Sequence, residues 1–143
     1  MLLKDIMSKE VESVLSSEAL ARARERMEQR GIHHLVVVNH GRVVGVVSAA
    51  DIEVRLAEGV ARVEDAMSRR VTVAGPETTV EEAARLMRRQ SHGALPVLAG
   101  QRLVGIVTIS DLLDVLGRRR GHVLRSSHRA GGKSQRGRTA IAG

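Results

Sequence analysis

Apolar residues early in the chain recur with the period of a helix. Leu20, Ala23 and Met27 stand at positions i, i+3 and i+7, which places them on one helical face, while charged residues between them take the other face. This spacing predicts an amphipathic helix over 18–30, with the Leu–Ala–Met face directed towards a core.

The residues around this helix follow strand and hairpin patterns. Two runs rich in Val, over 35–38 and 43–47, are separated by Asn39, His40 and Gly41, which predicts two β-strands joined by a hairpin. A short extended segment over 11–15 precedes the helix, and a second helix begins near Asp51. The order of elements is therefore β-α-β-β-α. The nearly continuous Val runs predict strands that are buried on both faces.

The same pattern recurs 60 residues later. Shifting the sequence by 60 positions aligns 5–53 with 65–113 without a gap and pairs identical residues along the whole stretch, Asp51 with Asp111 among them. The second copy predicts an extended segment over 71–74 and a helix over 80–90. Two strands follow, over 95–98 and 103–107, and a final helix begins at Asp111.

The repeat indicates a mixed α/β (α+β) chain of two tandem β-α-β-β-α units, 1–57 and 58–117. A unit of roughly 60 residues makes only a marginal core alone, so we expect the two units to pack on each other. Residues 118–143 form a separate segment with eight basic residues, no acidic residue and few apolar ones. This composition predicts a disordered basic tail.

Composition excludes several functional classes. The chain contains no Cys, which excludes disulfides, thiolate metal sites and a cysteine nucleophile. It contains no Phe, Tyr or Trp, so it lacks the aromatic platforms on which many single-strand nucleic-acid binders stack bases. No apolar run approaches the roughly 18 residues of a membrane span, and the N-terminus does not read as a signal peptide. We therefore expect a soluble cytoplasmic protein.

Three motifs appear in order in each repeat and resemble the cystathionine-β-synthase (CBS) domain, here as a tandem pair known as a Bateman module. The motifs of the two repeats are Asp5–Ser8 with Glu64–Ser68, Gly31–Val37 with Gly93–Val97, and Val44–Asp51 with Val104–Asp111. The resemblance covers about residues 1–116. The first repeat departs from the family at Val36, where the family usually has a Pro. The second repeat keeps this residue as Pro96. We expect the departure to affect only local rigidity.

The resemblance implies a regulatory module that binds adenosine-containing ligands, such as AMP, ADP, ATP or S-adenosylmethionine, in clefts between the repeats. In the family, an Asp bonds the ribose hydroxyls and a Ser or Thr three residues earlier bonds phosphate. Those positions are Ser48 with Asp51, and Thr108 with Asp111. Adenine would bond the backbone near Val11 or Val71.

A histidine pair adds a difference between the repeats. His33 and His34 stand where some relatives place a His–Arg pair facing phosphates, whereas the second repeat has Gly93 and Ala94 there. The resemblance therefore implies asymmetric phosphate capture.

Each candidate residue also has a purely structural interpretation. Asp51 and Asp111 each stand at the start of an apolar helix and suit its N-cap, which is compatible with ribose binding. Ser48 and Thr108 suit the end of a strand, and His33 and His34 suit a solvated loop. A zinc site from the histidines has no supporting spacing. The Met7/Met67 and Met27/Met87 pairs suit the core, and Gly45 and Gly105 suit a close backbone approach or a bulge.

The sequence contains neither a nucleophile elbow nor a phosphate-binding loop, and we interpret it as non-catalytic, without a cofactor or a metal. The expected function is nucleotide sensing by a homodimer that signals to an unidentified protein through a change of shape. The alternative is an interaction module whose basic tail docks to nucleic acid or to an acidic partner, with inactive clefts. A third interpretation is that the tail is solvated and has no function. We expect no contact with a membrane.

Overall fold

The computed structural model describes residues 1–89 and 93–119. The first repeat contains a 3₁₀ turn, three strands and two helices: η1 Leu3–Asp5, β1 Ser13–Leu15, α1 Leu20–Arg30, β2 His34–Asn39, β3 Arg42–Ser48 and α2 Ala49–Ala57. The second repeat follows the same order: η2 Val63–Asp65, α3 Val80–Arg88, β4 Ala94–Ala99, β5 Arg102–Thr108 and α4 Ile109–Arg119. The predicted α+β fold of two tandem repeats is confirmed. The tail lies outside the described residues from position 120 onwards.

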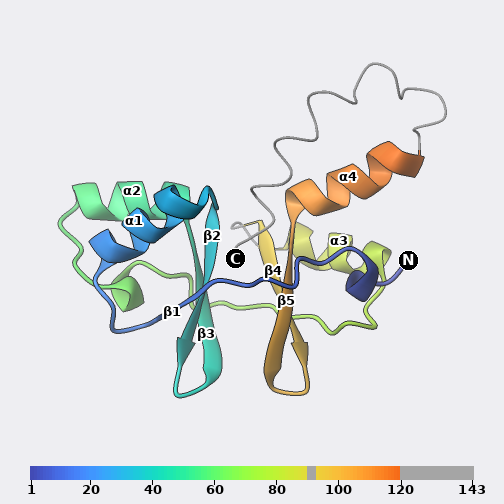
Figure 1. Ribbon diagram of the computed structural model, residues 1–143, viewed down its shortest axis with the longest axis horizontal. Coiled ribbons are helices and arrows are strands. Elements are labelled where there is room, and N and C mark those ends of the chain that lie inside the picture. Colours follow the sequence, from blue (N-terminus) through green and yellow to red (C-terminus); the bar gives the residue numbers. More distant parts are fainter. Residues whose placement is uncertain (90–92, 120–143) are drawn as a thin grey trace.

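Each repeat is built on one antiparallel hairpin. In the first, β2 pairs with β3 and β1 adds a parallel strand, giving the order β1-β2-β3. In the second, β4 pairs with β5, and the predicted strand over 71–74 is reduced to a single parallel bridge between Ala74 and Val97. Figure 1 shows the two hairpins side by side, with α1 and α2 over one end of the first repeat.

Pro96 contributes to the loss of the strand in the second repeat. In the first repeat, the backbone N–H of Val36 donates to the carbonyl of Glu12 at 3.3 Å and helps to join β1 to β2. The equivalent Pro96 has no N–H to donate, so the second repeat cannot make this hydrogen bond. The difference between Val36 and Pro96 thus changes the pairing of strands. The sequence had led us to expect an effect on local rigidity only.

The first helix begins later than its polar pattern predicts. Residue 18 lies before α1, because the Glu18 side chain accepts hydrogen bonds from the backbone N–H of Leu15 at 3.3 Å and from Arg26 at 3.2 Å. Glu18 therefore holds the turn that leads into the helix. In the second repeat, Thr79 caps α3 by accepting from the N–H of Glu82 at 3.1 Å.

The core consists of two apolar clusters that both include residues from the two repeats. The inner strands are buried on both faces as predicted, since Val36, Val37, Val46 and Val47 are fully buried. Ile106 of β5 packs into the cluster of the first repeat, so the hairpins share a core. Met27 and Met87 are buried, and Met7 and Met67 are partly buried.

The segments that lead into the two repeats are exchanged between them. We call residues 1–8 and 61–68 the lead-in segments. Leu3 is fully buried in the cluster of the second repeat, and its N–H donates to the carbonyl of Thr78 at 2.9 Å. Val63 is fully buried in the cluster of the first repeat, and its N–H donates to the carbonyl of Glu18 at 3.0 Å. Each repeat is therefore covered by the segment that precedes the other.

Gly45 and Gly105 allow the lead-in segments to lie directly on the strands. A Cβ atom on Gly45 would stand 2.7 Å from Sδ of Met67 and 2.8 Å from the carbonyl oxygen of Ser68. A Cβ atom on Gly105 would stand 2.5 Å from Sδ of Met7. Both glycines also lie opposite a register shift in the neighbouring strand. The predicted close approach of the backbone at both glycines is confirmed. The pairing between the two strands of each hairpin is also irregular at this point.

The exchange predicts that Leu3→Ala disturbs the second repeat, although Leu3 precedes the first. Truncating this buried leucine should lower the free energy of unfolding by about 2–5 kcal/mol. NMR amide shifts should change around residues 76–80 and in α3. As a control, Leu15→Ala at an exposed position should cost less than about 0.5 kcal/mol. Shift changes confined to β1 and α1 would contradict the exchange.

Candidate ligand-binding site

The four polar residues of the sequence motif stand at the N-termini of α2 and α4. Ser48 ends β3 and caps α2, because its Oγ accepts from the N–H of Asp51 at 3.1 Å. Thr108 ends β5, and its Oγ1 accepts from the N–H of Asp111 at 3.3 Å. The hydroxyl residues are thus the caps, and each helix begins just after them. The expectation that the aspartates are the N-caps is wrong, because each is the third residue of its helix.

The two carboxylates differ in how they are engaged. Oδ2 of Asp111 accepts from the N–H of Thr108 at 2.9 Å and from Oγ1 of Thr108 at 3.2 Å, which completes a reciprocal capping arrangement. Thr108 is 2% exposed and Asp111 is 7% exposed. Asp51 is half-buried, and within 1–89 and 93–119 no partner is found for its carboxylate. The first-repeat carboxylate is therefore the more available acceptor.

The lead-in segments place the backbone that precedes Val11 and Val71 against strands of the opposite repeats. Ser68 exchanges two backbone hydrogen bonds with Val46 of β3, at 3.0 and 3.3 Å, two residues before Ser48. Ser8 makes the same exchange with Ile106 of β5, at 3.0 Å each, two residues before Thr108. Val11 and Val71 are half-buried, three residues further along. The chain leading to Val71 thus runs beside the strand that ends in the Ser48 motif.

His33 and His34 have different surroundings in the structure. His33 is exposed, and its backbone carbonyl accepts from the N–H of Ala49 at 2.9 Å, which ties it to the start of α2. His34 is half-buried at the boundary between the repeats, where its Nε2 would lie 3.9 Å from a Cβ on Gly93. Only His34 therefore faces the second repeat.

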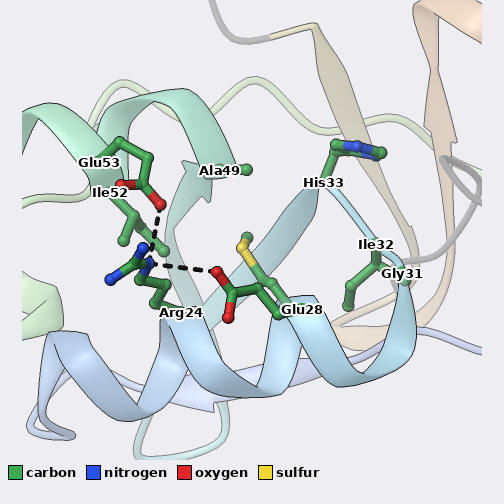
Figure 2. Close-up of a pocket in the computed structure, with 9 residues that line it drawn as sticks. Arg24, Glu28, Gly31, Ile32, His33, Ala49, Ile52 and Glu53 are labelled. Carbon is green, nitrogen blue, oxygen red and sulfur yellow. Dashed lines mark ion pairs between the residues drawn. The ribbon is translucent and has the colours of Figure 1, made fainter.

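A pocket that the sequence did not predict lies between α1 and α2. It has a volume of about 260 Å³, with apolar side chains such as Met27, Ile32 and Ile52 in its lining. At its rim, Arg24 forms ion pairs with Glu53 at 2.8 Å and with Glu28 at 3.4 Å (Figure 2). The i,i+4 spacing of Arg24 and Glu28 was the available signal, but the contact with Glu53 depends on how the helices pack. His33 and Ala49 also line the pocket, and Ala49 directly follows Ser48 in the chain.

Two negative findings apply to residues 1–89 and 93–119. These residues contain no group of three or more His, Asp or Glu side chains arranged to hold a metal ion. None of the helices in this part of the chain has both the length and the apolar character needed to cross a bilayer.

Comparison with known proteins identifies the repeats. The sequence model of the CBS domain matches residues 3–58 and again residues 63–118, which together make up most of the chain. The protein belongs to the CBS domain family. The repeats described above are therefore a CBS pair, and their arrangement recurs in solved structures of such pairs.

Two of these structures contain adenosine-based ligands. The CBS domain pair of protein MJ0100, crystallised with 5′-methylthioadenosine and S-adenosyl-L-methionine, is 31% identical with a TM-score of 0.78, and the match covers 83% of this chain and 98% of that one. CBSX2 in complex with AMP is 25% identical with a TM-score of 0.71, and the match again covers 83% and 98%. These two CBS pairs thus each bind an adenosine-containing ligand.

The curated relatives include much longer proteins. A homoserine O-acetyltransferase of Methanococcoides burtonii is 33% identical over 115 residues, which is 79% of this chain and 24% of that protein. This chain spans about a quarter of the length of the first curated relatives that it matches. Their activities therefore do not transfer with the match.

The unequal capping predicts unequal structural roles for the two aspartates. Asp111→Ala removes the acceptor of two hydrogen bonds at the start of α4 and should lower stability by about 0.5–2 kcal/mol. Asp51→Ala should cost less, because its carboxylate caps no backbone N–H in the part of the chain described. Urea denaturation followed by far-ultraviolet circular dichroism measures both values. Equal losses would contradict the difference in capping.

Proposed function

We propose that this CBS pair senses an adenosine-containing ligand, namely AMP, ADP, ATP or S-adenosylmethionine, and signals to a partner protein by a change of shape. The proposed ligand residues are those of the two Ser/Thr–Asp motifs with the backbone near Val11 and Val71, and with His33 and His34 at the phosphates. The adenosine moiety shared by the ligands of MJ0100 and CBSX2 supports this ligand class.

The observation that carries the proposal is the open carboxylate of Asp51 beside the N-terminus of α2. A carboxylate has enough acceptor sites to receive both vicinal hydroxyls of a ribose. The Ser48 hydroxyl and the first backbone N–H groups of the nine-residue helix α2 suit an anionic group such as a phosphate. The segment leading to Val71 supplies backbone groups from the opposite repeat, so a ligand there would contact both repeats. Such a ligand would favour one packing of the two repeats over another.

The two motifs should differ in affinity. At the Thr108 motif, Oδ2 of Asp111 already accepts two hydrogen bonds, so a ribose must compete with the helix cap. At the Ser48 motif no such competition is found among the described residues. We therefore propose that the site containing Asp51 fills first.

Calorimetric titration with AMP, ATP and S-adenosylmethionine tests this assignment. Asp51→Asn should weaken the tighter binding event by roughly 10- to 100-fold, because it removes charged hydrogen bonds worth about 1.5–3 kcal/mol. The matched variant Asp111→Asn keeps an oxygen acceptor for Thr108 and should alter only the weaker event. Unchanged affinity in the double variant, or no heat with any of the three ligands on folded protein, would refute the proposed site.

Removing the basic tail separates sensing from the alternative of tail-mediated docking. The second unit was predicted from the sequence to end at 117, but helix α4 continues to Arg119. The truncation should therefore be made after Arg119. The truncated chain 1–119 should bind the ligand with unchanged affinity in the same calorimetric titration. Loss of ligand binding would contradict the proposal. Strongly salt-dependent RNA binding by the full chain alone would instead favour the docking function.

We also propose that the CBS pair forms a homodimer. Three large apolar side chains are exposed on α4, and contiguous exposed apolar surface marks interaction sites in soluble proteins.

A further inference from the structure

The methionines of the chain differ in how far they are buried. The chain has five methionines and no cysteine, so its sulfur chemistry is that of the thioether alone. Met27 and Met87 lie inside the two apolar clusters and are only 3% and 5% exposed. Met7 and Met67, at equivalent positions of the lead-in segments, are half-buried and pack against these clusters. Solvent therefore reaches Met7 and Met67 more readily than the buried pair.

The sulfur atoms of Met7 and Met67 lie where the lead-in segments meet the opposite repeats. Sδ of Met67 is the heavy atom nearest to the Cβ position of Gly45, at 2.7 Å, and Sδ of Met7 is nearest to that of Gly105, at 2.5 Å. Figure 1 shows residues 1–8 beginning beside α3 of the second repeat and crossing from there towards the first. The packing therefore leaves no room for a further atom between either sulfur and the strand beneath it.

We propose that Met7 and Met67 are modification sites for hydroperoxides, and that their oxidation releases the lead-in segments from the opposite repeats. A sulfur lone pair attacks one oxygen of hydrogen peroxide, so that an S–O bond forms as the O–O bond breaks. The proton of the transferred oxygen moves to the departing hydroxide, which leaves as water. The thioether thus loses two electrons to the peroxide and becomes methionine sulfoxide. The step needs no catalytic group from this chain.

The added oxygen makes each side chain polar at the point where it packs against backbone. A sulfoxide oxygen accepts hydrogen bonds, and its burial without a donor is unfavourable. Next to Met67, the N–H groups of Ser68 and Val46 already donate to each other's carbonyls, at 3.0 and 3.3 Å. Ser8 and Ile106 pair in the same way, at 3.0 Å each. Oxidation therefore favours a state in which the bridge opens and the oxygen turns towards water.

The released segments lead directly to the backbone that is proposed to bind adenine, and this part of the inference rests on the proposed function. Val11 and Val71 follow the bridges of Ser8 and Ser68 by three residues. Opening either bridge removes the contact that keeps this backbone beside the motif of the other repeat. Oxidation should therefore weaken ligand binding, although the two Ser/Thr–Asp motifs contain no sulfur and stay chemically unchanged.

Peptide mass spectrometry of the full-length chain during treatment with hydrogen peroxide tests the assignment of the sites. Met7 and Met67 should be oxidised about tenfold faster than Met27 and Met87, because oxidation follows the exposure of the sulfur. Met1, which is 57% exposed, provides the internal reference for an unprotected thioether. Equal rates for the two pairs, or faster oxidation of the buried pair, would overturn the assignment.

Amide hydrogen exchange of the oxidised chain tests the release of the segments. The amides of Ser8, Val46, Ser68 and Ile106 should lose protection by about tenfold or more, because their hydrogen bonds form the two bridges. Oxidation of both sites with unchanged protection of these amides would overturn the release.

Leucine substitutions provide a matched pair of variants. Met7→Leu/Met67→Leu keeps apolar side chains of similar volume and removes both thioethers, so peroxide should no longer change the protection of the bridge amides. Met27→Leu/Met87→Leu removes the buried pair instead and should respond to peroxide like the wild type. A full peroxide response in the first variant would show that other groups are responsible and would overturn the inference.

Reversal provides a test on the wild-type chain without any substitution. The two methionine sulfoxide reductases, one for each epimer of the sulfoxide, should restore the protection of the bridge amides. Protection that stays low after mass spectrometry shows complete reduction would contradict a release caused by the sulfoxides.

Calorimetric titration of the reduced and the oxidised chain with AMP, ATP and S-adenosylmethionine separates this inference from the proposed function. Oxidation should weaken the binding of the ligand by about tenfold or more. Unchanged affinity would overturn the link between oxidation and sensing. No binding by the reduced chain would overturn the sensing function alone, because mass spectrometry and hydrogen exchange test the oxidation sites without a ligand.

Discussion

The packing of each lead-in segment against a glycine of the other repeat is the constraint on which the rest of the structure depends. Met67 and Ser68 lie so close to Gly45 that a single Cβ atom would displace them, and Met7 lies equally close to Gly105. This contact fixes where the chain continues towards Val71 and Val11. It therefore places backbone from one repeat beside the motif of the other. The absence of a Cβ atom at two glycines thus allows the chain of each repeat to lie beside the motif of the other.

The internal symmetry is kept in the core and broken at the N-termini of α2 and α4 and on the outer helices. Val37 and Val97, or Met27 and Met87, occupy equivalent buried positions, because both repeats must fill the same space at high density. At the helix N-termini, the Thr108 hydroxyl and the Asp111 carboxylate close on each other, whereas the Asp51 carboxylate stays open. On the outer helices, Glu28 and Arg88 have opposite charges. The two repeats thus share one scaffold and differ in the polar and charged groups at its surface.

Sequence periodicity predicted the elements well, because burial dictates where apolar residues recur. The Leu20, Ala23 and Met27 face and both Val hairpins appear where expected. The errors have local causes: Glu18 bonds to a turn, Pro96 lacks the N–H that would join a further strand, and Ser48 caps a helix expected to begin at Asp51. The exchange of lead-in segments and the Arg24–Glu53 pair were not predictable, because they depend on contacts between residues far apart in the chain. The roles of the motif residues rest on the family resemblance.

The exchanged lead-in segments also order events during synthesis. Leu3 is translated before the rest of the pair, yet its native neighbours include Thr78 and the strand that ends at Thr108. Its burial must wait until nearly the whole pair has been translated. Contacts of such long sequence separation carry a high loop-closure cost and slow folding. The first repeat, meanwhile, receives its cover from residues 61–68 soon after its own helices are complete, and only Ala94 and Ile106 join its core from later in the chain.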